Sequence, residues 1–162
     1  MSLTTGYIAL GSNIGERLEQ MRLSLELLKS KEVIILATSP VYENRAVGMG
    51  NANPFLNAVI KVQTRLKPED LLEVCLFIET ELGRVRNFHC SPRTIDLDIL
   101  LYGELFLKTD LLCLPHPRIA ERDFVLKPLM DIAPDLILCG QTVRALLDQL
   151  PNIELSCISQ NI

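Results

Sequence analysis

The sequence has little of several residue types, and each shortage limits what the protein can do. Its 162 residues include no tryptophan, two histidines and five cysteines, and no two cysteines have the close spacing of a metal-binding pair. We therefore expect reduced thiols in a cytoplasmic protein. No apolar run approaches the roughly 18 residues of a membrane span. We expect no signal peptide, because the first residues lack a basic start and a long apolar stretch. The net charge of −4 does not favour nucleic acid as a partner.

What is present suits one folded domain. The length and the 48% apolar content predict a single domain over residues 1–162. Apolar spacing and turn residues predict its elements in order. They are a strand over 6–10, a turn with helix-cap chemistry over 11–13, a helix over 15–30, strands over 33–38 and 55–63, a helix over 68–82 and a strand over 94–101. A hairpin turn over 102–104, an extended segment over 105–107, a short helix near 118–121 and a helix over 142–150 follow.

The order strand-helix-strand-strand-helix-strand is typical of the ferredoxin-like plan. We therefore predict an α+β fold in which helices cover one face of an antiparallel sheet. Long catalytic loops would lie on the other face, where a site can form. Residues 43–54 are rich in Gly and Asn and form one such loop, and an irregular stretch of about twelve residues in a small domain is often functional.

The sharpest short motif is Asp96-Leu97-Asp98. On a strand, residues i and i+2 share a face, so both carboxylates point to one side while Ile95, Leu97 and Ile99 point to the core. Mg²⁺ is typically held by one or two carboxylates together with substrate phosphates. Taken alone, the motif is more often the acidic wet face of an edge strand.

Basic side chains lie on both sides of this motif along the chain. They are Arg84, Arg86, His89 and Arg93 upstream, and His116, Arg118 and Arg122 downstream. Guanidinium groups bind phosphate oxygens through paired hydrogen bonds and keep their charge. Paired acids beside clustered arginines match a site that holds both a metal ion and a polyphosphate. The downstream group alone would also fit an ordinary surface turn.

Three further side chains permit two interpretations each. Glu79 lies beside the apolar stripe of its helix, as a solvated boundary carboxylate or as one directed at the site. Asn57 is either an ordinary strand residue or an amide that recognises the edge of a heterocycle. Phe124 is either a core residue or a flat stacking surface.

Six segments now combine into a pattern. They are residues 7–13 (YIALGSN), 55–58 (FLNA), 83–86 (GRVR), 92–98 (PRTIDLD), 115–118 (PHPR) and 121–126 (ERDFVL). In order and spacing, from about residue 7 to residue 136, they resemble the 6-hydroxymethyl-7,8-dihydropterin pyrophosphokinases of folate synthesis.

This resemblance implies a role for each matched position. Asp96 and Asp98 would hold metal, and with Arg84 and Arg93 they would be the catalytic residues. The nucleotide-binding residues would be Arg84, Arg86, Arg93, Ile99, His116 and Arg122. The pterin-binding residues would be Phe55, Asn57, Phe124, Asn44 and Val47, with Glu79 in a supporting position. Residues 44–52 and 84–92 are similar to two loops that close over the substrates.

The resemblance also implies an activity. It is the transfer of diphosphate from ATP to 6-hydroxymethyl-7,8-dihydropterin, which gives AMP and the pterin diphosphate and uses two Mg²⁺ ions with ATP. The enzyme would be a monomer that meets small-molecule substrates and neither nucleic acid nor membrane. The alternative is a ferredoxin-like nucleotide-binding or pterin-binding module without turnover. Departures from the family's loop pattern at Asn44-Arg45 and Cys90-Ser91 support that alternative.

Overall fold

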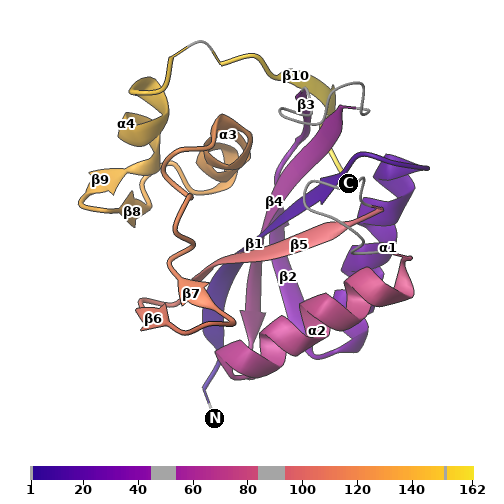
Figure 1. Cartoon of the computed structure of the whole chain (residues 1–162). Coiled ribbons are helices and arrows are strands. Elements are labelled where there is room, and N and C mark those ends of the chain that lie inside the picture. Colours follow the sequence, from indigo (N-terminus) through magenta and orange to yellow (C-terminus); the bar gives the residue numbers. More distant parts are fainter. Residues whose placement is uncertain (1, 45–53, 84–93, 152) are drawn as a thin grey trace.

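An antiparallel sheet organises the chain, and the computed structural model describes residues 2–44, 54–83, 94–151 and 153–162 (Figure 1). Within these residues the sheet has six strands, β1 (Thr4–Ser12), β2 (Val33–Thr38), β3 (Val41–Asn44), β4 (Phe55–Thr64), β5 (Asp96–Tyr102) and β10 (Ser156–Ser159). The helices are α1 (Arg17–Ser30), α2 (Pro68–Glu81), α3 (Asp123–Ile132) and α4 (Val143–Asp148). Two small hairpins are formed by β6 (Leu107–Lys108) with β7 (Cys113–Leu114), and by β8 (Ile137–Leu138) with β9 (Gln141–Thr142). None of these helices is long and apolar enough to cross a membrane.

The strand order confirms the ferredoxin-like class. β1 lies between β4 and β5, and β4 also pairs with β2 and β3, all antiparallel. The units β1-α1-β2 and β4-α2-β5 are the two halves of the plan. The helices and strands of these two units lie close to their predicted bounds. In α2, Pro68 stands in the first turn and Gly83, at φ 89°, follows the end, as the sequence predicted.

One face of the sheet packs against α1 and α2 (Figure 1). Alternate residues of β1, such as Ile8 and Leu10, point to this face and are almost fully buried. They meet helix residues spaced three or four apart, including Met21 of α1 and Ile78 of α2. Burying each large apolar side chain contributes roughly 1.5–3 kcal/mol, so this core fixes the register of the central strands.

The opposite face, which the sequence prediction left to loops, carries α3, with α4 packed against α3 (Figure 1). The helix predicted over 142–150 is present as α4, whereas α3 was not predicted. Leu126 and Leu129 of α3 pack there with Val59 of β4 and Leu100 of β5. The predicted short helix near 118–121 was wrong, since those residues form a turn and the helix begins at Asp123. Pro128 lies inside α3, and an internal proline normally argues against a helix.

Two other local predictions need correction. The cap predicted at 11–13 does not exist, because Gly11 and Ser12 continue β1 and α1 starts at Arg17 without a side-chain cap. The turn at 102–104 is present, with Leu105 N–H donating to the Tyr102 carbonyl at 3.1 Å, but the next strand does not return to β5. It pairs with β7 instead, since Thr109 closes its own turn with Leu112.

The beginning of the predicted 43–54 loop is a strand. β3 includes Asn44, pairs with β4, and is bordered by β10 from the C-terminal part of the chain. Residues 45–53 lie outside the described residues. The ring of Tyr42 on β3 lies beneath Lys127 of α3, and its hydroxyl donates to Asp131. This contact ties the sheet edge to the helix above it.

Candidate active site

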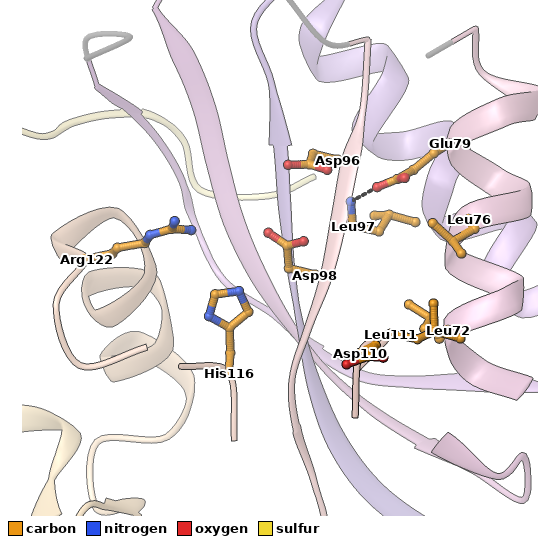
Figure 2. A pocket seen from close by; sticks show the side chains of 10 residues that line it. All are labelled: Leu72, Leu76, Glu79, Asp96, Leu97, Asp98, Asp110, Leu111, His116 and Arg122. Carbon is orange, nitrogen blue, oxygen red and sulfur yellow. Dashed lines mark hydrogen bonds between the residues drawn. The ribbon is translucent and has the colours of Figure 1, made fainter. Parts of the chain in front are cut away.

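Asp96 and Asp98 of β5 lie on one face of the sheet, as their spacing predicted. Both are half-buried, whereas Leu97 and Ile99 between and beyond them are buried on the α1–α2 side. Figure 2 shows the two carboxylates pointing the same way, toward Arg122 and His116. The registers of β1 with β5 place Asp96 opposite Gly11 and Asp98 opposite Ala9. Both acids therefore flank a part of the sheet that carries no large side chain.

These acids line a pocket of about 500 Å³ that reaches around the outer edge of β5. Its lining residues come from α2, β5, the β6–β7 hairpin and the segment leading into α3. They are Leu72, Leu76, Glu79, Asp96, Leu97, Asp98, Asp110, Leu111, His116 and Arg122. The pocket thus joins carboxylates and basic groups that are far apart along the chain, as Glu79 and Arg122, 43 positions apart, are.

His116 is held by hydrogen bonds of its backbone and of one ring nitrogen. Its backbone N–H donates to the Leu100 carbonyl of β5 at 2.9 Å, and its Nδ1 accepts the Arg118 N–H at 3.1 Å. A neutral ring therefore carries its proton on Nε2. Burial lowers the pKa of His116 below its usual value, Arg122 and Arg118 lower it further, and Asp96 acts in the opposite direction. An incoming anion would favour the charged imidazolium.

Arg122 is positioned at the start of α3. It is the residue that precedes the first helical turn, and its guanidinium lies 5.6 Å from the centre of the Phe124 ring. A cation above an aromatic face is held by the ring's negative charge density. Phe124 is half-buried against the core that α3 and α4 form with the sheet. Both earlier interpretations therefore apply to it, since part of the ring packs in the core and part is exposed.

Glu79 is directed at the site and is not a solvated boundary residue. Its side chain is 2% exposed, and its carboxyl oxygen accepts the Leu97 N–H at 2.8 Å. That donor lies on the outer edge of β5, between the two aspartates (Figure 2). A buried backbone N–H without a partner would be costly, so Glu79 supports the stretch of strand that carries both acids. Cys75, one turn earlier, has its thiol pKa raised to about 12 by burial and then by Glu79 and Asp98, so it stays a thiol.

A second polar group lies on the same sheet face, two strands away from the acids. The amide of Asn57 is 6% exposed and its Nδ2 donates to the Asn44 side chain at 2.6 Å. Phe55 pairs with Asn44, and Asn57 pairs with Gly11, which in turn pairs with Asp96. Phe55, Asn57 and Asn44 are therefore brought together beside the carboxylates.

The remaining predicted residues fall into two groups. Arg84, Arg86, Arg93 and Val47 lie outside the described residues, and their roles stay predictions. The side chain of Ile99 is 4% exposed and belongs to the α1–α2 core, so only its backbone could face a nucleotide. Arg118 of the downstream basic group is exposed and is absent from the pocket lining.

The apolar end of the pocket was missed from the sequence. Leu72 and Leu76 of α2 lie on one side and Leu111, which is 84% exposed, on the other. Leu72, Leu76 and Glu79 recur at i, i+4 and i+7, so they form one stripe of α2 beside the buried stripe. That spacing was a usable signal. The sequence offered no such signal for Leu111, because the β6–β7 hairpin decides where this side chain lies.

Two carboxylates, those of Asp96 and Asp98, are the candidate metal ligands of this site. Among the described residues no group of three or more His, Cys, Asp or Glu side chains could enclose an ion. Asp96 and Asp98 nevertheless fit Mg²⁺, which commonly takes one or two protein carboxylates and completes its shell with water and substrate phosphates. The donor set suits a metal that arrives with a polyphosphate.

Comparison with known proteins agrees with this geometry. The family model described as 7,8-dihydro-6-hydroxymethylpterin-pyrophosphokinase matches residues 7–134. The chain belongs to this pyrophosphokinase family. The resemblance drawn from the motifs is therefore confirmed. The family assignment covers the chain from within β1 to the end of α3.

Individual members of the pyrophosphokinase family are similar over most of this chain. A 2-amino-4-hydroxy-6-hydroxymethyldihydropteridine pyrophosphokinase of Methylorubrum extorquens is 43% identical over 149 residues, which are 91% of this chain and 94% of the relative. The folic acid synthesis protein fol1 of Pneumocystis carinii is 47% identical over 131 residues, which are 81% of this chain and 18% of the relative. The chain thus spans about a fifth of the length of the fungal relatives it matches.

A solved structure shares the fold of this chain. The crystal structure of Plasmodium falciparum HPPK-DHPS with pteroate aligns with a TM-score of 0.71 and 16% identity. The alignment covers 91% of this chain and 42% of that one. At this identity the match bears on the fold alone.

Proposed function

We propose that this chain transfers diphosphate from ATP to the hydroxymethyl group of 6-hydroxymethyl-7,8-dihydropterin, giving AMP and the pterin diphosphate, in folate synthesis. The observation that carries the proposal is the single pocket that unites Asp96 and Asp98 with His116 and Arg122. Family membership supports the same activity. In diphosphate transfer the protein has little covalent work to do, so positioning and charge neutralisation supply most of the acceleration.

The polar end of the pocket suits the polyphosphate. Asp96 and Asp98 would hold Mg²⁺. We propose that two Mg²⁺ ions bind together with ATP. Held there by the two carboxylates, the metal would supply neutralisation of phosphate charge. Arg122 and His116 face the acids from the opposite wall (Figure 2). Arg122 contributes a permanent charge, and the His116 Nε2–H can donate to a phosphate oxygen as charge develops on the leaving AMP.

The apolar end of the same pocket suits the nucleotide base. Leu72, Leu76 and Leu111 offer apolar surface a short way along the groove from the acids. A flat heterocycle gains from burial against such side chains, while the attached phosphates extend toward the charged end. This arrangement gives one ligand with an apolar head and an anionic tail a single orientation.

The pterin would occupy the neighbouring part of the sheet face. Asn57, supported by Asn44, has the planar donors and acceptors that recognise a heterocycle edge. Phe55 at the start of β4 and Phe124 at the start of α3 would contribute aromatic faces, since α3 packs over β4. Val47, Arg84, Arg86 and Arg93 remain predicted contacts. A monomer in the cytoplasm, with small molecules as its only partners, also remains our expectation.

The test is AMP release. We expect AMP only when ATP, Mg²⁺ and the hydroxymethyl-dihydropterin are all present, which a binding module without turnover would not produce. Asp98→Ala should lower turnover about 100-fold or more, because metal-assisted charge stabilisation supplies several kcal/mol of the barrier reduction. Pterin binding should change less. Asp148→Ala, an exposed residue of α4, is the matched control. Near-normal turnover in Asp98→Ala would show that the metal assignment is wrong.

A further inference from the structure

Position 11 is a glycine, although the backbone conformation there does not require one. It lies near the end of β1 and is paired on both sides, with Asn57 of β4 and Asp96 of β5. A glycine inside a strand costs conformational entropy and gives no side-chain packing. Positive φ would justify it, but the described glycines with positive φ are elsewhere, at positions 15, 83, 103 and 140. Any residue could adopt the backbone conformation at this position.

Local packing does not require the glycine either. At Gly6, on the same strand, an added Cβ would lie 2.8 Å from the Leu101 carbonyl oxygen, so a side chain is excluded there. At Gly11 the nearest described atoms would be the Phe55 ring at 3.7 Å and the Asn57 Oδ1 at 3.8 Å. Both are ordinary van der Waals distances. Among the described residues, nothing would therefore exclude a methyl group at Gly11.

The position of Gly11 suggests what the space is for. On the sheet face of the candidate site, Gly11 separates the Asn57 amide from the Asp96 carboxylate. The next residue of β1 on this face is Ala9, beside Asp98. Gly11 is partly exposed, and so is Ala9. Among the described residues, the floor between the amide and the acids is thus formed by Gly11 and Ala9, with the Phe55 ring beside Gly11.

We propose that Gly11 is a specificity-determining residue, whose missing side chain leaves the floor between Asn57 and Asp96 open for the plane of a pterin ring. This inference rests on the proposed function. A ring that lies flat on β1 can meet Asn57 with one edge while its hydroxymethyl group extends toward Asp96 and Asp98. A branched side chain at Gly11 would occupy the space of the ring and leave the polyphosphate end of the pocket unchanged.

The experiment compares Gly11→Ala and Gly11→Val with the unmodified protein. Calorimetric titration with Mg²⁺ and α,β-methylene-ATP, followed by 6-hydroxymethyl-7,8-dihydropterin, measures the two affinities separately. Thr5→Val is the control, since Thr5 lies on the same face of β1 near its other end. Overpacking typically costs about 1–3 kcal/mol, so we expect Gly11→Val to weaken pterin binding roughly 10- to 100-fold. Gly11→Ala should weaken it less, and in both variants nucleotide affinity should change less than pterin affinity.

Thermal stability separates this role from a structural one. Replacing glycine at a compatible position reduces the entropy of the unfolded chain, so we expect Gly11→Ala to raise the melting temperature by about 1–4 °C. A stabler protein with weaker pterin binding supports the proposal. Unchanged pterin affinity in both variants would overturn it, and so would parallel losses of stability and of both affinities. If the unmodified protein bound no pterin, the proposed function itself would fail, which is a different result from pterin binding that tolerates Gly11→Val.

Discussion

Replacing Glu79 with alanine tests how the fold holds the two aspartates. The buried Glu79 carboxyl accepts the Leu97 N–H at 2.8 Å, on the side of β5 that faces away from β1. Without the acceptor, this buried N–H loses its partner, at a cost of about 1–3 kcal/mol in the free energy of unfolding. For a chain of this length, that loss lowers the melting temperature by roughly 2–12 °C.

The same substitution should affect catalysis through the spacing of Asp96 and Asp98. Leu97 lies between them, so a strand that is no longer held at Leu97 places its two carboxylates less accurately for Mg²⁺. We expect Glu79→Ala to lower turnover and to raise the Mg²⁺ concentration needed for half-maximal AMP release. A site loosened by about 1 Å can lose on the order of 100-fold in rate.

Glu79→Gln is the matched variant, because its amide oxygen can accept the same N–H. We expect it to keep the melting temperature and the Mg²⁺ dependence close to those of the unmodified protein. Thermal melts and AMP release at varied Mg²⁺ concentration measure both effects. If glutamine disturbs the Mg²⁺ dependence as much as alanine does, the site needs the negative charge of Glu79 and the hydrogen-bond reasoning is refuted.

Two further predictions follow from the charges around the site. Burial and then Arg122 lower the pKa of His116, and bound polyphosphate should raise it, so nucleotide binding should take up protons and weaken as pH rises through the bound-state pKa. Calorimetry in buffers of different ionisation enthalpy measures the uptake, and identical uptake by His116→Gln would contradict this. Arg17 Nη1 pairs with Glu43 at 2.7 Å and donates to the Pro54 carbonyl at 2.8 Å, next to the strand ends that carry the pterin residues. Partly exposed ion pairs contribute roughly 0.2–1 kcal/mol, so Arg17→Ala should raise the KM for pterin about 1.4- to fivefold. An equal rise in the KM for ATP would argue against a local role.

Local patterns were sufficient for several elements and for part of the site. The alternation around Asp96 and Asp98 predicted that the two acids share a face, because successive side chains of a strand point to opposite sides. Pro68 and Gly83 marked the limits of α2, because each suits one end of a helix. In α3 the local signal pointed the wrong way, since Pro128 breaks the pattern of a helix that is stabilised by burial of Leu126 and Leu129 against the sheet.

The sequence by itself determined the two strand-helix-strand units, the paired acids and the basic groups, since each depends on residues close together along the chain, and six matched segments carried the family pattern. Only the tertiary structure decided that Glu79 meets the Leu97 N–H, that Leu111 faces α2, and that Gly11 separates Asn57 from Asp96. These relations depend on which strands pair and in which register. Pairing is set by burial of residues that are far apart in sequence, so no local spacing contains it.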